Sequence, residues 1–111
     1  MRVILIPEVE DYLYELVEIL YRNEYFGFKS SAVSYVVNLI SEIENNIQFS
    51  TRRKAPLYFN RYGKDLLCSF FSINKSTTWY VFYSIYLVGN EEVYVIKFIT
   101  NNHVHGRYFN Q

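Results

Sequence analysis

The sequence contains little cysteine, proline or glycine: one, two and four residues respectively among 111. The single thiol, Cys68, cannot form a disulfide within the chain, and its apolar neighbours predict a buried strand instead of the exposed, electropositive niche of a reactive thiolate. CxxC pairs, HExxH motifs and glycine-rich phosphate loops are all missing. We therefore expect no metal and no cofactor.

Long apolar segments are also missing. No apolar run approaches the roughly 20 residues that a membrane-crossing helix needs. Residues 1–20 have neither the basic start nor the small-residue cleavage site of a signal peptide. We therefore expect a cytoplasmic protein with no membrane partner.

Apolar and aromatic side chains are abundant: half of the residues are hydrophobic and 20% are aromatic. This composition is too apolar for a disordered segment, and the length predicts a single domain over residues 1–111. The aromatics number 12 Tyr, 9 Phe and 1 Trp, 22 in all, which is more than a core of this size conveniently hides. We expect an apolar patch left open for a partner or for a homodimer.

The net charge is zero, but the charges are sorted along the chain. Residues 1–50 hold three basic and eight acidic side chains, a net charge of −5, and residues 51–111 hold eight basic and three acidic ones, a net charge of +5. Such asymmetry points to a nucleic acid or an acidic partner on the basic side. Two ordinarily solvated surfaces would give the same pattern.

The order of elements predicts an α+β fold: an N-terminal strand, an antiparallel helical hairpin and a three-stranded antiparallel meander. Residues 2–6 are apolar and β-branched, and Pro7 ends them. Apolar residues at three- and four-residue spacing predict helices over residues 8–24 and 31–47. The connection over residues 48–65 is charged and aperiodic, which predicts a long functional or mobile loop. The predicted meander strands are residues 66–73, 77–87 and 93–100.

Both faces of the predicted middle strand carry aromatic side chains. Trp79 and Tyr83 lie on one face, and Tyr80 and Phe82 lie on the other, because side chains alternate along a strand. We expect one face to meet the helices and the other to be a binding face.

The tail over residues 101–108 (NNHVHGRY) concentrates the chemistry. Histidine moves protons near neutral pH, arginine holds a phosphate by two hydrogen bonds, and tyrosine stacks on a base or donates its hydroxyl. Together, His103, His105, Arg107 and Tyr108 suit a metal-free attack of a ribose 2′-hydroxyl on its own phosphate. Each histidine alone could instead be structural, and the two asparagines could simply turn the chain. An extended tail would place both imidazoles on one side, but without a nearby carboxylate a metal site is disfavoured.

Basic residues precede the meander. Arg52, Arg53 and Lys54 would grip an RNA backbone without reading its sequence, helped by Arg61 and Lys64. A solvated loop is the alternative explanation for the triplet.

Two stretches, NKSTTWYVFYSIY and VYVIKFITNNHVHGRYF, resemble the RelE/ParE superfamily of toxins from type II toxin-antitoxin modules, and a Bacteroidetes-type branch in particular. The resemblance covers essentially the whole chain, and the predicted element order is that of the family. It implies a small cytoplasmic protein that halts growth when free and is neutralised by a cognate antitoxin. Many members cleave ribosome-bound mRNA in the A site without a metal, whereas the ParE-like branch inhibits DNA gyrase.

The resemblance also implies roles for individual residues. The family's acid-base or stacking side chains fall on His103, His105 and Tyr108, its phosphate-binding arginine falls on Arg107, and its basic residues after the second helix fall on the triplet. Nuclease members commonly have an arginine early in the middle strand. This chain departs from that pattern, with Lys75 only in the preceding turn, because the strand begins with Thr77, Thr78, Trp79 and Tyr80.

The first hypothesis is a ribosome-dependent, metal-independent endoribonuclease. Arg107 with Lys75 would neutralise the phosphate, a tail histidine would transfer protons, and Tyr108 or Trp79 would stack on a base. The second hypothesis is a toxin that blocks gyrase or another protein and catalyses nothing, which the missing arginine favours. The third is a non-catalytic member that only binds an antitoxin. In each case we expect a disordered antitoxin segment to fold across the open apolar patch and cover the basic face with acidic side chains.

Overall fold

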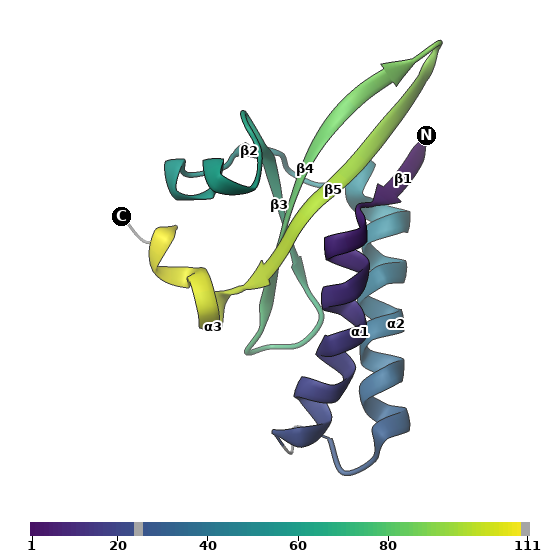
Figure 1. Cartoon of the computed structure of the whole chain (residues 1–111), viewed down its shortest axis with the longest axis vertical. Coiled ribbons are helices and arrows are strands. Elements are labelled where there is room, and N and C mark those ends of the chain that lie inside the picture. Colours follow the sequence, from purple (N-terminus) through teal and green to yellow (C-terminus); the bar gives the residue numbers. More distant parts are fainter. Residues whose placement is uncertain (24–25, 110–111) are drawn as a thin grey trace.

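The computed structural model describes residues 1–23 and 26–109, and it places a helical hairpin against a mixed β-sheet (Figure 1). The predicted α+β class is confirmed. Residue 24, the predicted end of the first helix, lies outside the described residues. The helices and strands are β1 (Arg2–Leu5), α1 (Pro7–Arg22), α2 (Lys29–Asn46), β2 (Arg53–Lys54), β3 (Leu67–Ser72), β4 (Thr78–Val88), β5 (Glu91–Asn101) and α3 (Asn102–His105), with 3-10 helices η1 (Ile47–Phe49), η2 (Leu57–Tyr62) and η3 (Gly106–Tyr108).

The sheet is larger than the predicted meander. Among the described residues it has five strands in the order β1-β5-β4-β3-β2. Strands β3, β4 and β5 form an antiparallel meander at its centre, β1 pairs in parallel with β5, and β2 pairs antiparallel with β3. The sequence pattern missed the two-residue β2, which is too short to show a period. It also gave no partner for β1, which pairs with residues near the other end of the chain.

The helical hairpin covers one face of the sheet. Pro7 starts α1, and Glu8 and Glu10 lie in its first turn, where the helix dipole favours negative charge. The buried stripes of α1 and α2 pack against Val81, Tyr83 and other residues of the meander to form the main core. The helix side chains buried there include Val9, Leu13, Leu16, Val36, Leu39 and Ile43.

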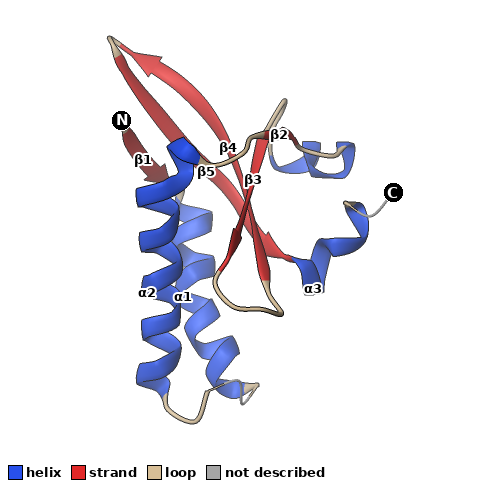
Figure 2. Ribbon diagram, turned by 180° about the vertical axis from the view of Figure 1, so that it is seen from behind, coloured by secondary structure: helices blue, strands red, loops and turns tan. Residues whose placement is uncertain are grey.

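A second apolar core, here called the aromatic cluster, lies on the opposite face of the sheet. Figure 2 shows η2 and α3 on the side of the strands away from the hairpin. Tyr80 and Phe82 alternate along β4 with the residues that face the helices, so they point into this second core. The cluster consists of buried Ala55, Phe59, Leu66, Cys68, Tyr80 and Phe82, with Tyr58, Tyr62, Phe70, Phe98, Tyr108 and Phe109 packed around them.

This cluster corrects two expectations. The second face of the meander is not an open binding face, because η2 and the tail cover it. The connection over residues 48–65 is also not a structureless loop, because it contains η1, β2 and η2. Phe59, which is completely buried, stacks on Phe82 with ring centroids 4.3 Å apart and holds η2 against the sheet.

Cys68 lies in the aromatic cluster and is completely buried. Burial raises the pKa of its thiol to about 12, so the thiol stays protonated at neutral pH. In the described parts of the chain no helix combines the length and the apolar character needed to span a membrane.

We predict that Phe59→Ala lowers the free energy of unfolding by about 3–5 kcal/mol, because it leaves a cavity among the rings of the aromatic cluster. Urea denaturation followed by circular dichroism measures the loss. Phe49→Ala is the matched control: its ring is 77% exposed, and we expect a change below about 0.5 kcal/mol. Equal losses in the two variants would show that the cluster does not stabilise the fold.

Candidate functional site

The structure brings tail residues and η2 together in one layered arrangement. The guanidinium of Arg61 lies 3.9 Å from the centre of the Tyr58 ring, and Tyr58 stacks on Tyr108 with centroids 3.8 Å apart and planes 18° apart. Arg107 donates a hydrogen bond of 2.9 Å to the Tyr108 hydroxyl. We call these four residues the cationic stack. It presents two cations and a pair of aromatic rings in one place.

Local hydrogen bonds hold each side of the stack. In η2, Arg61 Nε donates to the Tyr58 carbonyl oxygen at 3.0 Å, which lays the guanidinium over the ring. At the end of β5, the Asn101 side chain accepts hydrogen bonds from the backbone N–H groups of His103 and Val104 and caps α3. The chain therefore turns back over the sheet at this point.

The second asparagine of the tail also has a structural role. Asn102 Oδ1 accepts a hydrogen bond from the Thr78 backbone N–H at 2.8 Å, and its Nδ2 donates to the Ser76 carbonyl oxygen at 3.2 Å. These bonds tie the tail to the β3–β4 turn. Both asparagines therefore follow the structural alternative in which they turn and hold the chain.

His105 lies next to the cationic stack. Its Nδ1 forms a 2.7 Å hydrogen bond with Thr100 Oγ1, and its ring packs between Phe59 and Tyr108 at centroid distances of 5.6 and 5.7 Å. Burial, and then the positive charges of Arg107 and Arg61, lower the pKa of His105 below its usual value. His105 is therefore neutral at pH 7 and can accept a proton.

Tyr108 differs electrostatically from an ordinary tyrosine. The hydrogen bond from Arg107 is the main cause that lowers the pKa of its hydroxyl, with Arg61 contributing as a nearby positive charge. A hydroxyl whose anion is stabilised in this way gives up its proton more readily. His105 is thus a proton acceptor, and neighbouring Tyr108 is an improved proton donor.

His103 lies apart from this group. Its Nε2 is 3.1 Å from Thr77 Oγ1, beside the β3–β4 turn that carries Lys75. The tail is helical and not extended, and side chains two residues apart on a helix do not face each other. The extended tail that would place His103 and His105 on one side is therefore not formed. Among the described residues, no group of three or more His, Cys, Asp or Glu could hold a metal ion.

The basic triplet divides between the two faces of the sheet. Arg52 donates a hydrogen bond to the hydroxyl of Tyr94, a residue of the helix-side core. Arg53 lies 3.9 Å from the centre of the Phe70 ring, which belongs to the aromatic cluster. Arg52 directly precedes β2, and Arg53 is the first residue of that strand, so the two neighbours lie on opposite faces. Of these two arginines, only Arg53 shares a face with the cationic stack.

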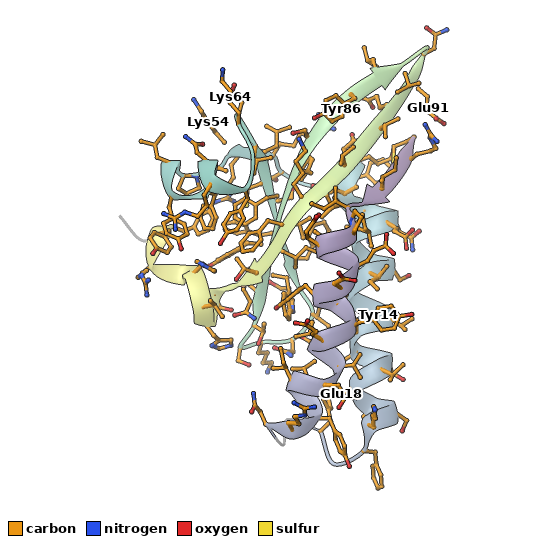
Figure 3. All side chains as sticks on the ribbon, viewed as in Figure 1. Tyr14, Glu18, Lys54, Lys64, Tyr86 and Glu91 are labelled. Carbon is orange, nitrogen blue, oxygen red and sulfur yellow. The ribbon has the colours of Figure 1, made fainter. Side chains whose placement is uncertain are left out.

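Of the lysines predicted to bind RNA, Lys54 follows Arg53 in β2 and pairs with Leu67, which packs against the helix-side core, so it points away from the face of Arg53. Lys54 and Lys64 are exposed and project from the same end of the molecule in the view of Figure 3. Their exposure leaves them accessible to a phosphate backbone.

Trp79 cannot stack on a base in this structure. Only 1% of its surface is exposed, and its indole Nε1 donates a 2.9 Å hydrogen bond to the Tyr35 hydroxyl of α2. The assignment of Trp79 to nucleic-acid binding is therefore wrong: the residue belongs to the helix-side core. The sequence analysis missed Tyr58, whose ring is sandwiched between Arg61 and Tyr108 in the cationic stack. The only available signal was its position three residues before Arg61.

Comparison of the chain with protein-family models, with curated proteins and with solved structures gave no match in any of the three.

The lowered pKa of His105 can be measured directly. In a His103→Gln background, which leaves one imidazole, we expect the NMR titration midpoint of His105 to lie below about 6.5. Arg107→Gln should raise this midpoint by removing a positive charge, while burial still holds it below the ordinary value. The unfolded chain binds the proton more readily, so stability should fall as the pH drops below about 6.5. A midpoint at or above the ordinary value would contradict the packed environment of His105.

Proposed function

We propose that this chain is the toxin of a RelE/ParE-like toxin-antitoxin pair and acts as a metal-independent, ribosome-dependent mRNA endoribonuclease. The observation that carries the proposal is the convergence of His105, Tyr108, Arg107 and Arg61 at one surface. The element order and the tail motif support the same family. A phosphodiester needs such a set of groups: a base, an acid and cations for the phosphate charge.

The arrangement suits an internal attack on RNA. Neutral His105 takes the proton from a ribose 2′-hydroxyl, and the 2′ oxygen forms a bond to the adjacent phosphorus. The bond from phosphorus to the 5′ oxygen breaks, which leaves a 2′,3′-cyclic phosphate, and Tyr108 supplies a proton to the departing 5′ oxygen. Arg107 and Arg61 offset the charge that builds up on the phosphate. When Nδ1 of His105 donates to Thr100 Oγ1, Nε2 keeps a lone pair for the first proton transfer.

The arginine missing from the middle strand has a replacement in this scheme. Trp79 lies near the start of β4 and is buried in the helix-side core. Arg61, from η2, brings a cation to the surface of the cationic stack instead. Lys75 and His103 lie at the β3–β4 turn and are available to contact RNA farther along.

A gyrase-directed toxin is the second candidate. The absence of an arginine at residues 77–80 favours it, because nuclease members of the family commonly carry one. Expression would then trigger DNA-damage signalling and leave transcripts intact. A non-catalytic member that only binds its antitoxin would leave growth unaffected.

The proposal includes a cognate antitoxin as partner. An apolar groove of about 660 Å³ runs between α1 and α2, lined by Val33 and Val37, and Tyr14 beside it is 82% exposed. Figure 3 shows Tyr14 and Glu18 on the hairpin, away from Lys54 and Lys64. An antitoxin with apolar residues for this groove and acidic residues for the cationic stack would cover both surfaces.

We predict that Arg107→Ala increases the number of surviving colonies at least about tenfold. Losing a charge contact to the phosphate raises the activation free energy by about 1.4 kcal/mol or more, and each such increment lowers the cleavage rate tenfold. Arg22→Ala is the matched control, since Arg22 lies on the hairpin and contacts Glu18 only at 4.0 Å. If Arg107→Ala is soluble, melts cooperatively and stays fully toxic, the role given to Arg107 is wrong.

Mapping RNA 5′ ends after induction separates the candidate functions. We expect new in-frame ends within translated messages, and we expect His105→Gln to abolish them while preserving the fold. Arrested cells with intact messages would support the gyrase candidate instead.

A further inference from the structure

A second cavity lies beside the cationic stack, between the start of α1 and strand β5. Its volume is about 420 Å³, within the range of small-ligand pockets. Its walls are largely apolar, with Val9 from α1 and Ile99 from β5 on opposite elements. Tyr62 and Phe98 line it as a stacked pair, with ring centroids 3.7 Å apart and planes 6° apart, so only the outer faces of the pair are left for another ring. An outer face of this pair offers a planar ring a stacking surface.

Three charged side chains line the same cavity: Glu8, Arg61 and Lys97. Within the part of the chain that the structure describes, none of them forms an ion pair. Arg61 also belongs to the cationic stack, and Lys97 Nζ is held by a 2.9 Å hydrogen bond to the Tyr86 hydroxyl. Two cations and one carboxylate therefore border the stacked aromatic pair.

We propose that this cavity binds one nucleotide. The base stacks on an outer face of the Tyr62–Phe98 pair, and Arg61 and Lys97 hold its phosphate. Glu8 accepts a hydrogen bond from an amino group of the base, which favours guanine, adenine and cytosine over uracil. The chemistry fits two sources: a free nucleotide, or a nucleotide of bound RNA next to the one at the stack. The second source rests on the proposed function, and Arg61 then links the two positions.

The test is a titration of the whole isotope-labelled protein with GMP, UMP and guanosine, followed by amide NMR. We expect the amides of Val9, Phe98 and Ile99 to shift on GMP binding. UMP should bind about fivefold more weakly, because it offers no amino group to Glu8, and guanosine about tenfold more weakly, because it lacks the phosphate. The absence of shifts at these amides up to about 10 mM GMP would overturn the proposal.

Two variants separate the roles of the charged groups. Glu8→Gln should reduce the preference for GMP over UMP, and Lys97→Met should weaken both nucleotides about tenfold. Glu10→Gln is the matched control: it lies on the same helix but lines the groove between α1 and α2. If Glu10→Gln changes GMP affinity as much as Glu8→Gln does, binding reflects general charge and the proposed site is wrong.

A trinucleotide with a 2′-deoxy sugar at each position distinguishes the two sources. Binding at least about tenfold tighter than GMP, with the same amides shifted, assigns the site to RNA. Equal affinity assigns it to a free nucleotide. The proposed function is tested separately. If Arg107→Ala stays toxic while GMP binds, the nuclease proposal fails and the nucleotide pocket stands. If Arg107→Ala loses toxicity while GMP does not bind, only the pocket proposal is overturned.

Discussion

The packing of Phe59 under the tail is the contact on which the candidate site depends. Its ring is completely buried, stacks on Phe82 of the sheet and meets both His105 and Tyr108 from the side. Because η2 and the tail are both short, neither would hold its place alone. The aromatic cluster therefore supplies the rigidity that brings residues from distant parts of the sequence to one surface.

The same rings also determine where the positive charges lie. Arg61, Arg53 and Arg107 each rest over an aromatic ring, at 3.9, 3.9 and 4.8 Å from its centre. An arginine on a ring face is oriented and keeps its outer N–H groups available, which suits phosphate binding. A chain of zero net charge thus places three arginines over rings on one face of the sheet, while Arg52 lies on the helix side and Glu8 of α1 reaches the cavity beside Arg61.

The sequence predicted the α+β class, the helical hairpin and the central strands, because these elements have clear periodicity over many residues. The sequence could not show which face of β4 meets the helices, because Trp79 and Tyr80 suit either face equally. The packing of α2 against Trp79 determines which face it is. Within the site, His105, Arg107 and Tyr108 were named together, as the structure places them. Tyr58 and the separation of His103 were missed because both depend on the helical turn of the tail and on η2, which are too short to leave a pattern.

The most direct measurement of the account is a set of nuclear Overhauser contacts between aromatic rings in solution. The structure predicts cross-peaks between the Tyr58 and Tyr108 rings, whose centroids are 3.8 Å apart, and between the rings of Phe59 and His105. Their presence, with protected backbone amides in the tail, would establish the surface that carries the proposed chemistry. A tail that gives no contacts to η2 and exchanges its amides freely would contradict it.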